Sequence, residues 1–336
     1  METIRILHAS DLHIAEIPDL LSPADHFSAG TFFDLLRKRT AAASYNKQVL
    51  QSFADLAWEM ADGRKSPPID AVILTGDIAT TGLPRDLEVA QEFLNSPPWL
   101  PFFPTRTWEM EPTLAGLKIP VWILPGNHDR YQLSLKSFYE PGGEEFDHYF
   151  EDKWRGPVMV YDPPLRQADC VVRLIGADFN LLHGSDCHGK WYNQLAQGKV
   201  YAHILTALVR ETRKVRTQHA EPHSLAVVWA VHFPPRYPSL RQAMRLLQEE
   251  TLIEMANRYG VTAMLAGHTH EAARYRIPGM HFDVFCAGTV SQRLTEEDRN
   301  GNHCQILNFH FYDDGACGIE LENYLFDRVK SAFLKV

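Results

Sequence analysis

The stretch VWILPGNHDR, residues 121–130, passes from a short apolar run into glycine, asparagine, histidine and aspartate. Gly126 and Asn127 tolerate left-handed backbone angles, so a turn that ends a strand explains part of this pattern. A turn needs neither His128 nor Asp129. An imidazole beside a carboxylate and an amide oxygen is also a usable catalytic or metal-binding cluster. The stretch alone leaves both interpretations open, and the rest of the chain decides between them.

The same change from apolar to polar residues ends four other strand-like runs: IRILHASDLH at 4–13, AVILTGD at 71–77, LAVVWAVH at 225–232 and VTAMLAGHTH at 261–270. Between the runs lie stretches with helical periodicity, at 45–63, 83–95, 199–218 and 239–260. Alternating strands and helices predict an α/β protein. In such proteins, sites collect beyond the carboxyl ends of the strands.

After GHTH the sequence pattern changes to strand-like runs separated by turn residues, which predicts a mainly β C-terminal part. We expect a single domain in which residues 1–290 carry the site and residues 291–336 add the last strands. Three segments resist assignment and are interpreted as excursions near the site, at about 14–45, 97–120 and 140–195.

Composition places the chain among globular proteins and narrows its partners. Of the 336 residues, 45% are hydrophobic and 22% charged, and the net charge of -9 argues against duplex nucleic acid as a partner. Five cysteines without CxxC spacing suggest neither a disulfide framework nor a thiolate zinc site. No secretion signal or membrane-length apolar run is visible, so we expect a cytoplasmic protein without a membrane partner.

Metal-competent side chains follow each of the five strand-like runs: Asp11, His13, Asp77, Asn127, His128, His232, His268 and His270. Strands that share a direction present their carboxyl ends at one edge, so these residues can converge on one cleft. Carboxylate, imidazole and amide oxygen suit manganese, iron or zinc. Two ions that share Asp77 would use every ligand, and paired ions suit in-line displacement at phosphorus.

Each piece also has a commoner structural explanation when taken alone. Asp11 with His13 fits a helix N-cap and a surface imidazole, Asp77 fits a strand-to-helix turn, and His232 fits a hydrogen-bonded core residue. The run GHTH is harder to dismiss, because two histidines spaced by two point to the same side of an extended segment. Their shared position at strand ends favours a metal centre.

The ordered set DxH, GD, GNHD, a strand-end His and GHTH resembles the calcineurin-like metallophosphoesterase superfamily over residues 11–270. The resemblance implies two packed β-sheets flanked by helices, a four-layer sandwich, with the metals at one end. It also implies two divalent or trivalent ions, of manganese, iron or zinc.

Roles for individual residues follow from the same resemblance. It implies that one metal is bound by Asp11, His13 and His270, that the other is bound by Asn127, His232 and His268, and that Asp77 bridges them. His128 would contact the phosphate and protonate the leaving oxygen, with Asp129 as its orienting partner. A hydroxide that bridges the metals would attack phosphorus.

The substrate is less well indicated. GDIATTG lacks the DRG of the similar serine/threonine phosphatases, and VHFPP at 231–235 resembles the HHPP segment of bacterial cyclic-nucleotide phosphodiesterases, with Phe233 in place of the second His. We therefore expect a phosphodiesterase for a small or nucleotide-like phosphoester. A phosphomonoesterase, a nuclease and a non-catalytic binding scaffold stay open as alternatives, and the oligomeric state is open.

Two arginines adjoin the motifs and are candidate substrate contacts. Arg130 and Arg236 could bind a phosphate through their guanidinium groups, although surface salt bridges explain them equally well. A second polar cluster at 183–190, with two histidines and a cysteine, is interpreted as a turn.

Overall fold

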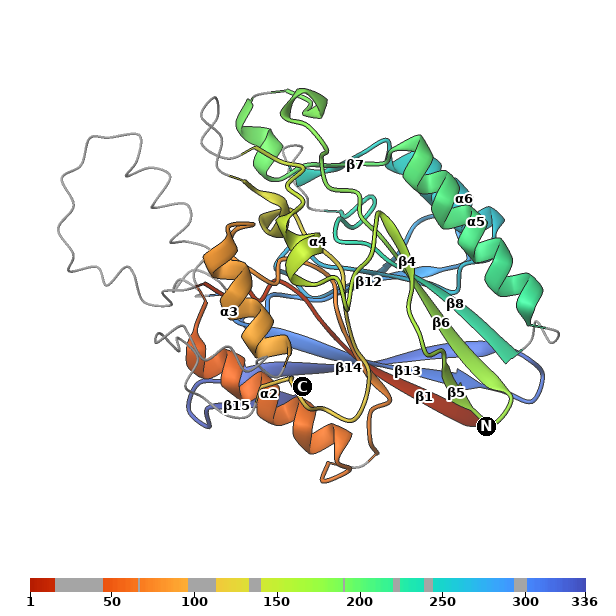
Figure 1. Cartoon of the computed structure of the whole chain (residues 1–336). Coiled ribbons are helices and arrows are strands. Elements are labelled where there is room, and N and C mark those ends of the chain that lie inside the picture. The colour runs from red at the N-terminus through yellow and green to blue at the C-terminus, as the bar shows by residue number, and fades with distance from the viewer. Residues whose placement is uncertain are drawn as a thin grey trace.

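The computed structural model shows two stacked β-sheets with helices on their outer faces (Figure 1). It describes residues 1–15, 45–65, 67–95, 113–132, 140–189, 191–219, 224–238, 244–292 and 301–336. Most of the expected excursions 14–45 and 97–120 lies outside these residues.

The first sheet joins the two ends of the chain. Its order is β15 (Ala332–Lys335), β14 (Cys317–Asp327), β13 (His303–Phe311), β1 (Glu2–Ala9), β2 (Ala71–Leu74) and β3 (Val121–Ile123). Strands β1, β2 and β3 are parallel, whereas β13 runs antiparallel to β1. The mainly β C-terminal part is therefore confirmed, and its strands complete the sheet that β1 begins.

The second sheet has a parallel centre. Its order is β11 (Ala273–Arg276), β12 (Asp283–Cys286), β10 (Ala263–Ala266), β8 (Leu225–Ala230), β6 (Cys170–Ala177) and β4 (Val158–Val160), with β5 (Leu165–Gln167) paired to β6. The expectation of an excursion over 140–195 is wrong for 158–177, which forms β4 to β6. The run CVVRLIGA is β-branched and apolar, but surrounding prolines and aromatics obscured it.

Four layers result from the alternation of side chains along the strands. On β6, Val172 and Leu174 face the core between the sheets, while Val171 and Ile175 pack toward the helices of the second sheet. Helices α2 (Lys47–Ala61) and α3 (Pro84–Leu94) cover the first sheet, and α5 (Ala202–Gln218) and α6 (Glu249–Arg258) cover the second (Figure 1). The predicted sandwich is confirmed.

Three of the four predicted helices occur as expected, and the fourth is shorter. In the described part of the stretch 239–260, which is 244–260, the helix begins only at Glu249. Before it, β9 (Leu246–Leu247) pairs with β7 (Gly198–Lys199), and Gln248 takes a left-handed φ of 62°. Strand pairing here overrides local helix propensity.

The remaining elements are short: α4 (Glu145–Tyr149) and the 3-10 turns η1 (His128–Arg130), η2 (Gly184–Asp186) and η3 (Trp191–Leu195). Within the described part of the chain, every helix is too short or too polar to cross a membrane.

Candidate metal centre

The carboxyl ends of five strands from both sheets meet at one place. Asp11 and His13 follow β1, Asp77 follows β2, and Asn127 follows β3 in the first sheet. In the second sheet, His232 follows β8, and His268 and His270 follow β10. A bridge between Ser10 and Thr289 ties the two sheets together at this end. All seven predicted ligands therefore lie in one region.

Five of these residues have a positive φ, in the left-handed region that residues other than glycine rarely adopt. The φ angles are 55° at Asp11, 50° at His13, 52° at Asp77, 69° at His268 and 56° at His270. Such strain persists only where the surrounding structure imposes it, and it clusters at functional sites. The strained backbone angles therefore mark the same functional region that the sequence motifs indicate.

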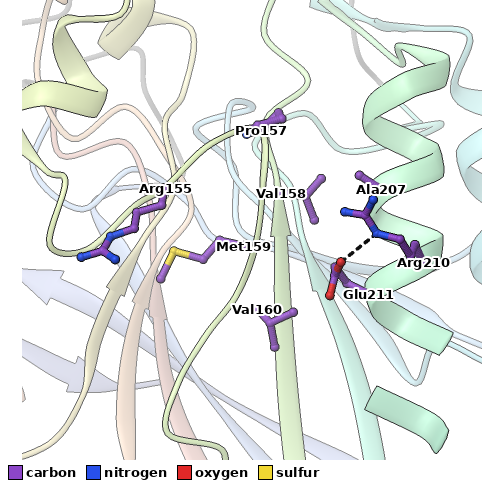
Figure 2. A pocket seen from close by; sticks show the side chains of 8 residues that line it. All are labelled: Arg155, Pro157, Val158, Met159, Val160, Ala207, Arg210 and Glu211. Carbon is purple, nitrogen blue, oxygen red and sulfur yellow. Dashed lines mark hydrogen bonds and ion pairs between the residues drawn. The ribbon is translucent and has the colours of Figure 1, made fainter. Parts of the chain in front are cut away.

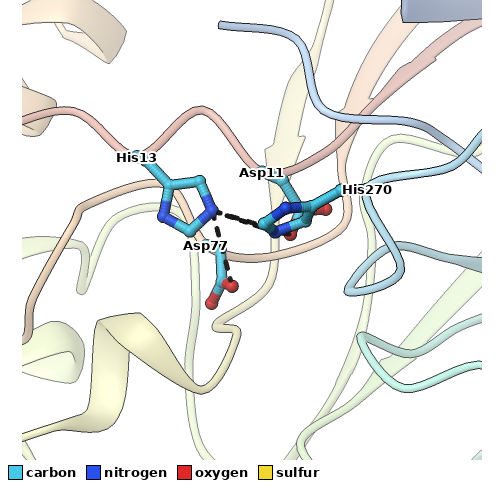
Figure 3. Close-up of side chains that lie close together, drawn as sticks. All are labelled: Asp11, His13, Asp77 and His270. Carbon is cyan, nitrogen blue, oxygen red and sulfur yellow. Dashed lines mark hydrogen bonds and ion pairs between the residues drawn. The ribbon is translucent and has the colours of Figure 1, made fainter. Parts of the chain in front are cut away.

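Asp11, His13, Asp77 and His270 form the first group, with one ligand atom from each within 4.8 Å of the others (Figure 3). The Nε2 atoms of His13 and His270 lie 3.3 Å apart, and Asp11 Oδ1 lies 3.1 Å from His270 Nε2. Two ligands about 2.0 to 2.2 Å from one ion are separated by roughly 3 to 3.5 Å. These spacings therefore fit a shared cation.

The second group consists of Asp77, His232 and His268, also within 4.8 Å. Asp77 Oδ2 lies 3.4 Å from His232 Nε2, and Asn127 Oδ1 lies 2.9 Å from the same nitrogen. Asp77 is thus the one residue common to both groups, which is the geometry that a bridging carboxylate needs.

Backbone carbonyls orient the rings of the second group. Thr75 O accepts from His232 Nδ1 at 2.7 Å, which leaves Nε2 facing Asp77. Met244 O accepts from His268 Nε2 at 3.1 Å, which leaves Nδ1 as the ring nitrogen available to bind a metal ion. Such outer hydrogen bonds fix the tautomer of a metal-binding histidine. The sequence gives no signal for them, because any residue carries a carbonyl.

Asn127 is held by two partners that sequence reasoning missed. Its Nδ2 donates to Tyr131 Oη at 2.7 Å and to Leu195 O at 3.0 Å, so Oδ1 is directed at His232. Tyr131 is buried, and its ring lies 5.2 Å from that of His128.

Replacement of Tyr131 by phenylalanine is expected to weaken metal binding at the second group by about 10-fold, because outer-partner changes typically have that effect. The first group should keep its affinity. Isothermal titration of metal-free protein measures both steps. Tyr161→Phe is the matched control, since Tyr161 is equally buried but donates to Ile123 O instead. Equal affinities in both variants would contradict the assignment.

Charges in the cluster are arranged for a cation. Burial alone would raise the pKa of Asp77, but His232 and His128 hold it well below its usual range. Burial lowers the pKa of His13 to about 3 and that of His268 to about 3. At His232, Asp77 outweighs burial and raises the pKa to about 9. The raised pKa of His232 shows that positive charge is favoured at this position. A metal ion that binds here would displace the proton from the ring.

Two buried atoms of the cluster, Asp11 Oδ1 and His13 Nδ1, are among the side-chain atoms that lack a hydrogen-bond partner in the described part of the chain. Burying a polar atom without a partner is costly, and a bound cation would satisfy Asp11 Oδ1. Gly126 allows the close packing, because a Cβ there would overlap the Asp77 carboxylate. The donor set fits manganese, iron or zinc.

His128 lies at the edge of the cluster, in η1. Its backbone N–H donates to Asp77 Oδ1 at 2.8 Å, and its ring Nδ1 lies 2.8 Å from Thr80 O. The ring is 4.7 Å from that of His13. The second ring nitrogen, Nε2, is then the one available to a substrate.

The expected pairing of Asp129 with His128 is wrong. The Asp129 carboxylate accepts from the backbone N–H groups of Gly126 at 2.8 Å, Ala79 at 2.8 Å and Ile78 at 3.2 Å. It therefore ties together the loops after β2 and β3. Successive residues of a 3-10 turn point about 120° apart, so neighbours in η1 face different partners.

The two arginines are engaged with carboxylates. Arg130 is buried, and its N–H groups donate to Asp178, Asp147 and the Gly143 carbonyl. All three guanidinium nitrogens are thus used by the protein, so the prediction that Arg130 binds substrate is wrong. Arg236 pairs with Glu250 at the surface, and its contact with substrate stays a prediction.

The described residues of the cluster, 183–189, contain η2, and contacts to residues 199 and 201 hold this turn in place. Asp186 binds Lys199 at 2.8 Å and Tyr201 Oη at 2.7 Å. The predicted turn is consistent with this arrangement.

A separate pocket of about 380 Å³ lies between β4 and α5 (Figure 2). Val158 and Val160 line one side of it, and the Arg210–Glu211 pair lines the other. None of the predicted site residues contributes to its walls. The candidate chemistry therefore belongs to the strand-end cluster.

Residues 4–272 match the calcineurin-like phosphoesterase family, and the chain belongs to this family. A probable glycerophosphodiester phosphodiesterase GpdQ of Arcobacter nitrofigilis is 24% identical over 210 residues, which are 62% of this chain and 59% of that protein. The chain thus spans less than two thirds of that relative.

Two solved structures share the fold. A dimetal phosphatase from Danio rerio has a TM-score of 0.52 at 13% identity, over 99% of this chain and 98% of that one. GAP50, described as the anchor in the inner membrane complex of Plasmodium, has a TM-score of 0.52 at 11% identity, over 100% and 89%. At these identities the likeness concerns the fold alone.

Proposed function

We propose that the protein is a dinuclear-metal phosphodiesterase that acts on a small or nucleotide-like substrate. The observation that carries the proposal is the position of Asp77, which belongs to both ligand groups. One carboxylate shared by two buried clusters is the arrangement that two adjacent ions require.

The ligands divide between two ions in the proposed enzyme. Asp11, His13 and His270 would hold one ion, Asn127, His232 and His268 would hold the other, and Asp77 would serve both. When bound, such a pair lowers the pKa of water and neutralises phosphate oxygens.

His128 supplies the proton in this proposal. Thr80 O holds ring Nδ1, so Nε2 faces the leaving oxygen and donates to it. The carboxylate of Asp129 keeps the loop that carries His128 against the loop that carries Asp77. It acts through the backbone and takes no part in proton transfer.

Two observations support a diester substrate. The relative from Arcobacter carries a phosphodiesterase name. Moreover, Arg130 and Arg236 are both neutralised by carboxylates, which suits a singly charged diester better than a doubly charged monoester. The five cysteines all lie in the described residues and form no disulfide there, which supports a reducing compartment such as the cytosol.

An activity panel tests the proposal. Protein reconstituted with Mn²⁺ is assayed on bis(p-nitrophenyl) phosphate, p-nitrophenyl phosphate, glycerophosphodiesters, cyclic nucleotides and single-stranded DNA. We expect a small diester to have the highest kcat/KM. A preference for the monoester or for DNA would replace the proposed substrate class. Metal binding without any turnover would identify a binding scaffold.

A further inference from the structure

Thr80 lies three residues after Asp77 and connects the loops after three strands. It is buried, at 5% exposure. Its N–H donates to Ile14 O at 2.8 Å, and its hydroxyl donates to His13 O. Its own carbonyl lies 2.8 Å from His128 Nδ1. One residue therefore contacts the peptide of a predicted metal ligand and the ring of the predicted proton donor.

We propose that Thr80 is a positioning residue that couples His13 to His128. It touches neither substrate nor metal, and it acts only through these two histidines. His13 needs such support, because its φ of 50° is unfavourable and its ring Nδ1 has no hydrogen bond in the described part of the chain. The Thr80 hydroxyl and the bond from His13 N to Asp77 O at 2.9 Å hold the strained peptide on both sides.

The same hydroxyl also determines where the Thr80 carbonyl points. With the N–H fixed to Ile14 and Oγ1 fixed to His13, the Thr80 residue has little freedom to rotate. Its carbonyl is then aimed at His128. Loss of the hydroxyl should loosen His13 and His128 together. The catalytic consequence of this coupling rests on the proposed function, but the contacts themselves do not.

Neighbouring Thr81 provides a matched control. It has the same 5% exposure, and its hydroxyl donates to Asp86 Oδ2 at 2.6 Å, at the start of α3. Thr80→Val and Thr81→Val each remove one buried hydroxyl with little change in shape. Only the first removes a contact to the metal cluster, and Thr80→Ser restores that hydroxyl.

The first measurement is metal affinity, by Mn²⁺ titration of metal-free protein. Thr80→Val should bind the ion of the His13 group about 10- to 100-fold more weakly, as changes in outer partners of metal ligands do. Thr80→Ser and Thr81→Val should stay close to the wild type. Circular dichroism confirms that each variant is folded. Equal affinities of the two valine variants would overturn the proposal, as would a serine variant as weak as Thr80→Val.

The second measurement is the ring N–H signal of His128 in nuclear magnetic resonance, assigned by its loss in His128→Ala. Hydrogen bonding to Thr80 O should slow its exchange with water in the wild type and in Thr81→Val. Faster exchange in Thr80→Val, reversed in Thr80→Ser, supports the coupling, and unchanged exchange overturns it. Neither measurement depends on phosphoesterase activity. The substrate panel tests the proposed function separately, so the two proposals can fail independently.

Discussion

Replacement of Asp77 by alanine is expected to abolish binding of both metal ions, whereas replacement of any other ligand should affect mainly one. Asp77 is the residue shared by the two ligand groups, and its carboxylate is buried beside His13 and His232. Without it, each group loses its bridging oxygen and a negative charge. Activity should fall by more than about 10³-fold, because water activation and charge neutralisation both depend on the ions.

Metal analysis after dialysis checks this expectation. Wild-type protein should retain two ions per chain and Asp77→Ala none, while His268→Ala should retain the ion of the first group. Asp283→Ala is the control for loss of a buried carboxylate, because Asp283 pairs with Arg274 and Arg276 on β11. An Asp77→Ala protein that still holds both ions would exclude the bridging assignment.

The position of the candidate site was predictable because ligands at strand ends follow a simple rule. Parallel strands such as β1, β2 and β3 end at one edge, so Asp11, Asp77 and Asn127 had to lie near one another. That β8 and β10 belong to a second sheet which meets the first at the same end was not derivable from periodicity. The resemblance to a known superfamily supplied that part.

Contacts to the backbone were not predictable, and they explain the errors around η1. The resemblance implies that Asp129 orients His128, yet its carboxylate accepts from the N–H groups of Gly126 and Ala79. Arg130 was assigned to substrate because it adjoins the motif. Its partner Asp178 is 48 residues away and follows β6, a strand that was not predicted.

The late start of α6 within the stretch 239–260 has a related cause. Its apolar spacing predicts a helix throughout, but Met244 and Leu247 use their carbonyls for other partners, His268 Nε2 and Val200 N. A residue inside a helix would give its carbonyl to the helix itself. Tertiary contacts near the metal cluster thus delay the start of the helix to Glu249, and no local sequence pattern indicates them.

Replacement of His128 by alanine is expected to leave both metals bound and to reduce kcat by about 10²- to 10⁴-fold for diesters with poor leaving groups. Alanine keeps the backbone N–H that donates to Asp77 Oδ1, so the loop and the bridging carboxylate should stay in place. Only the ring near His13 is lost. A p-nitrophenyl leaving group needs no protonation, so its kcat should change far less.

The ratio of the two rates distinguishes proton donation from a general loss of structure. His310→Ala is the control, because His310 pairs with Thr3 and Glu320 near the amino end of β1, opposite the cluster. It should alter neither metal content nor the ratio. If His128→Ala lowers both rates equally, His128 binds the phosphate without protonating the leaving oxygen. If the variant loses metal instead, His128 supports the ligands, and the proton must come from another group.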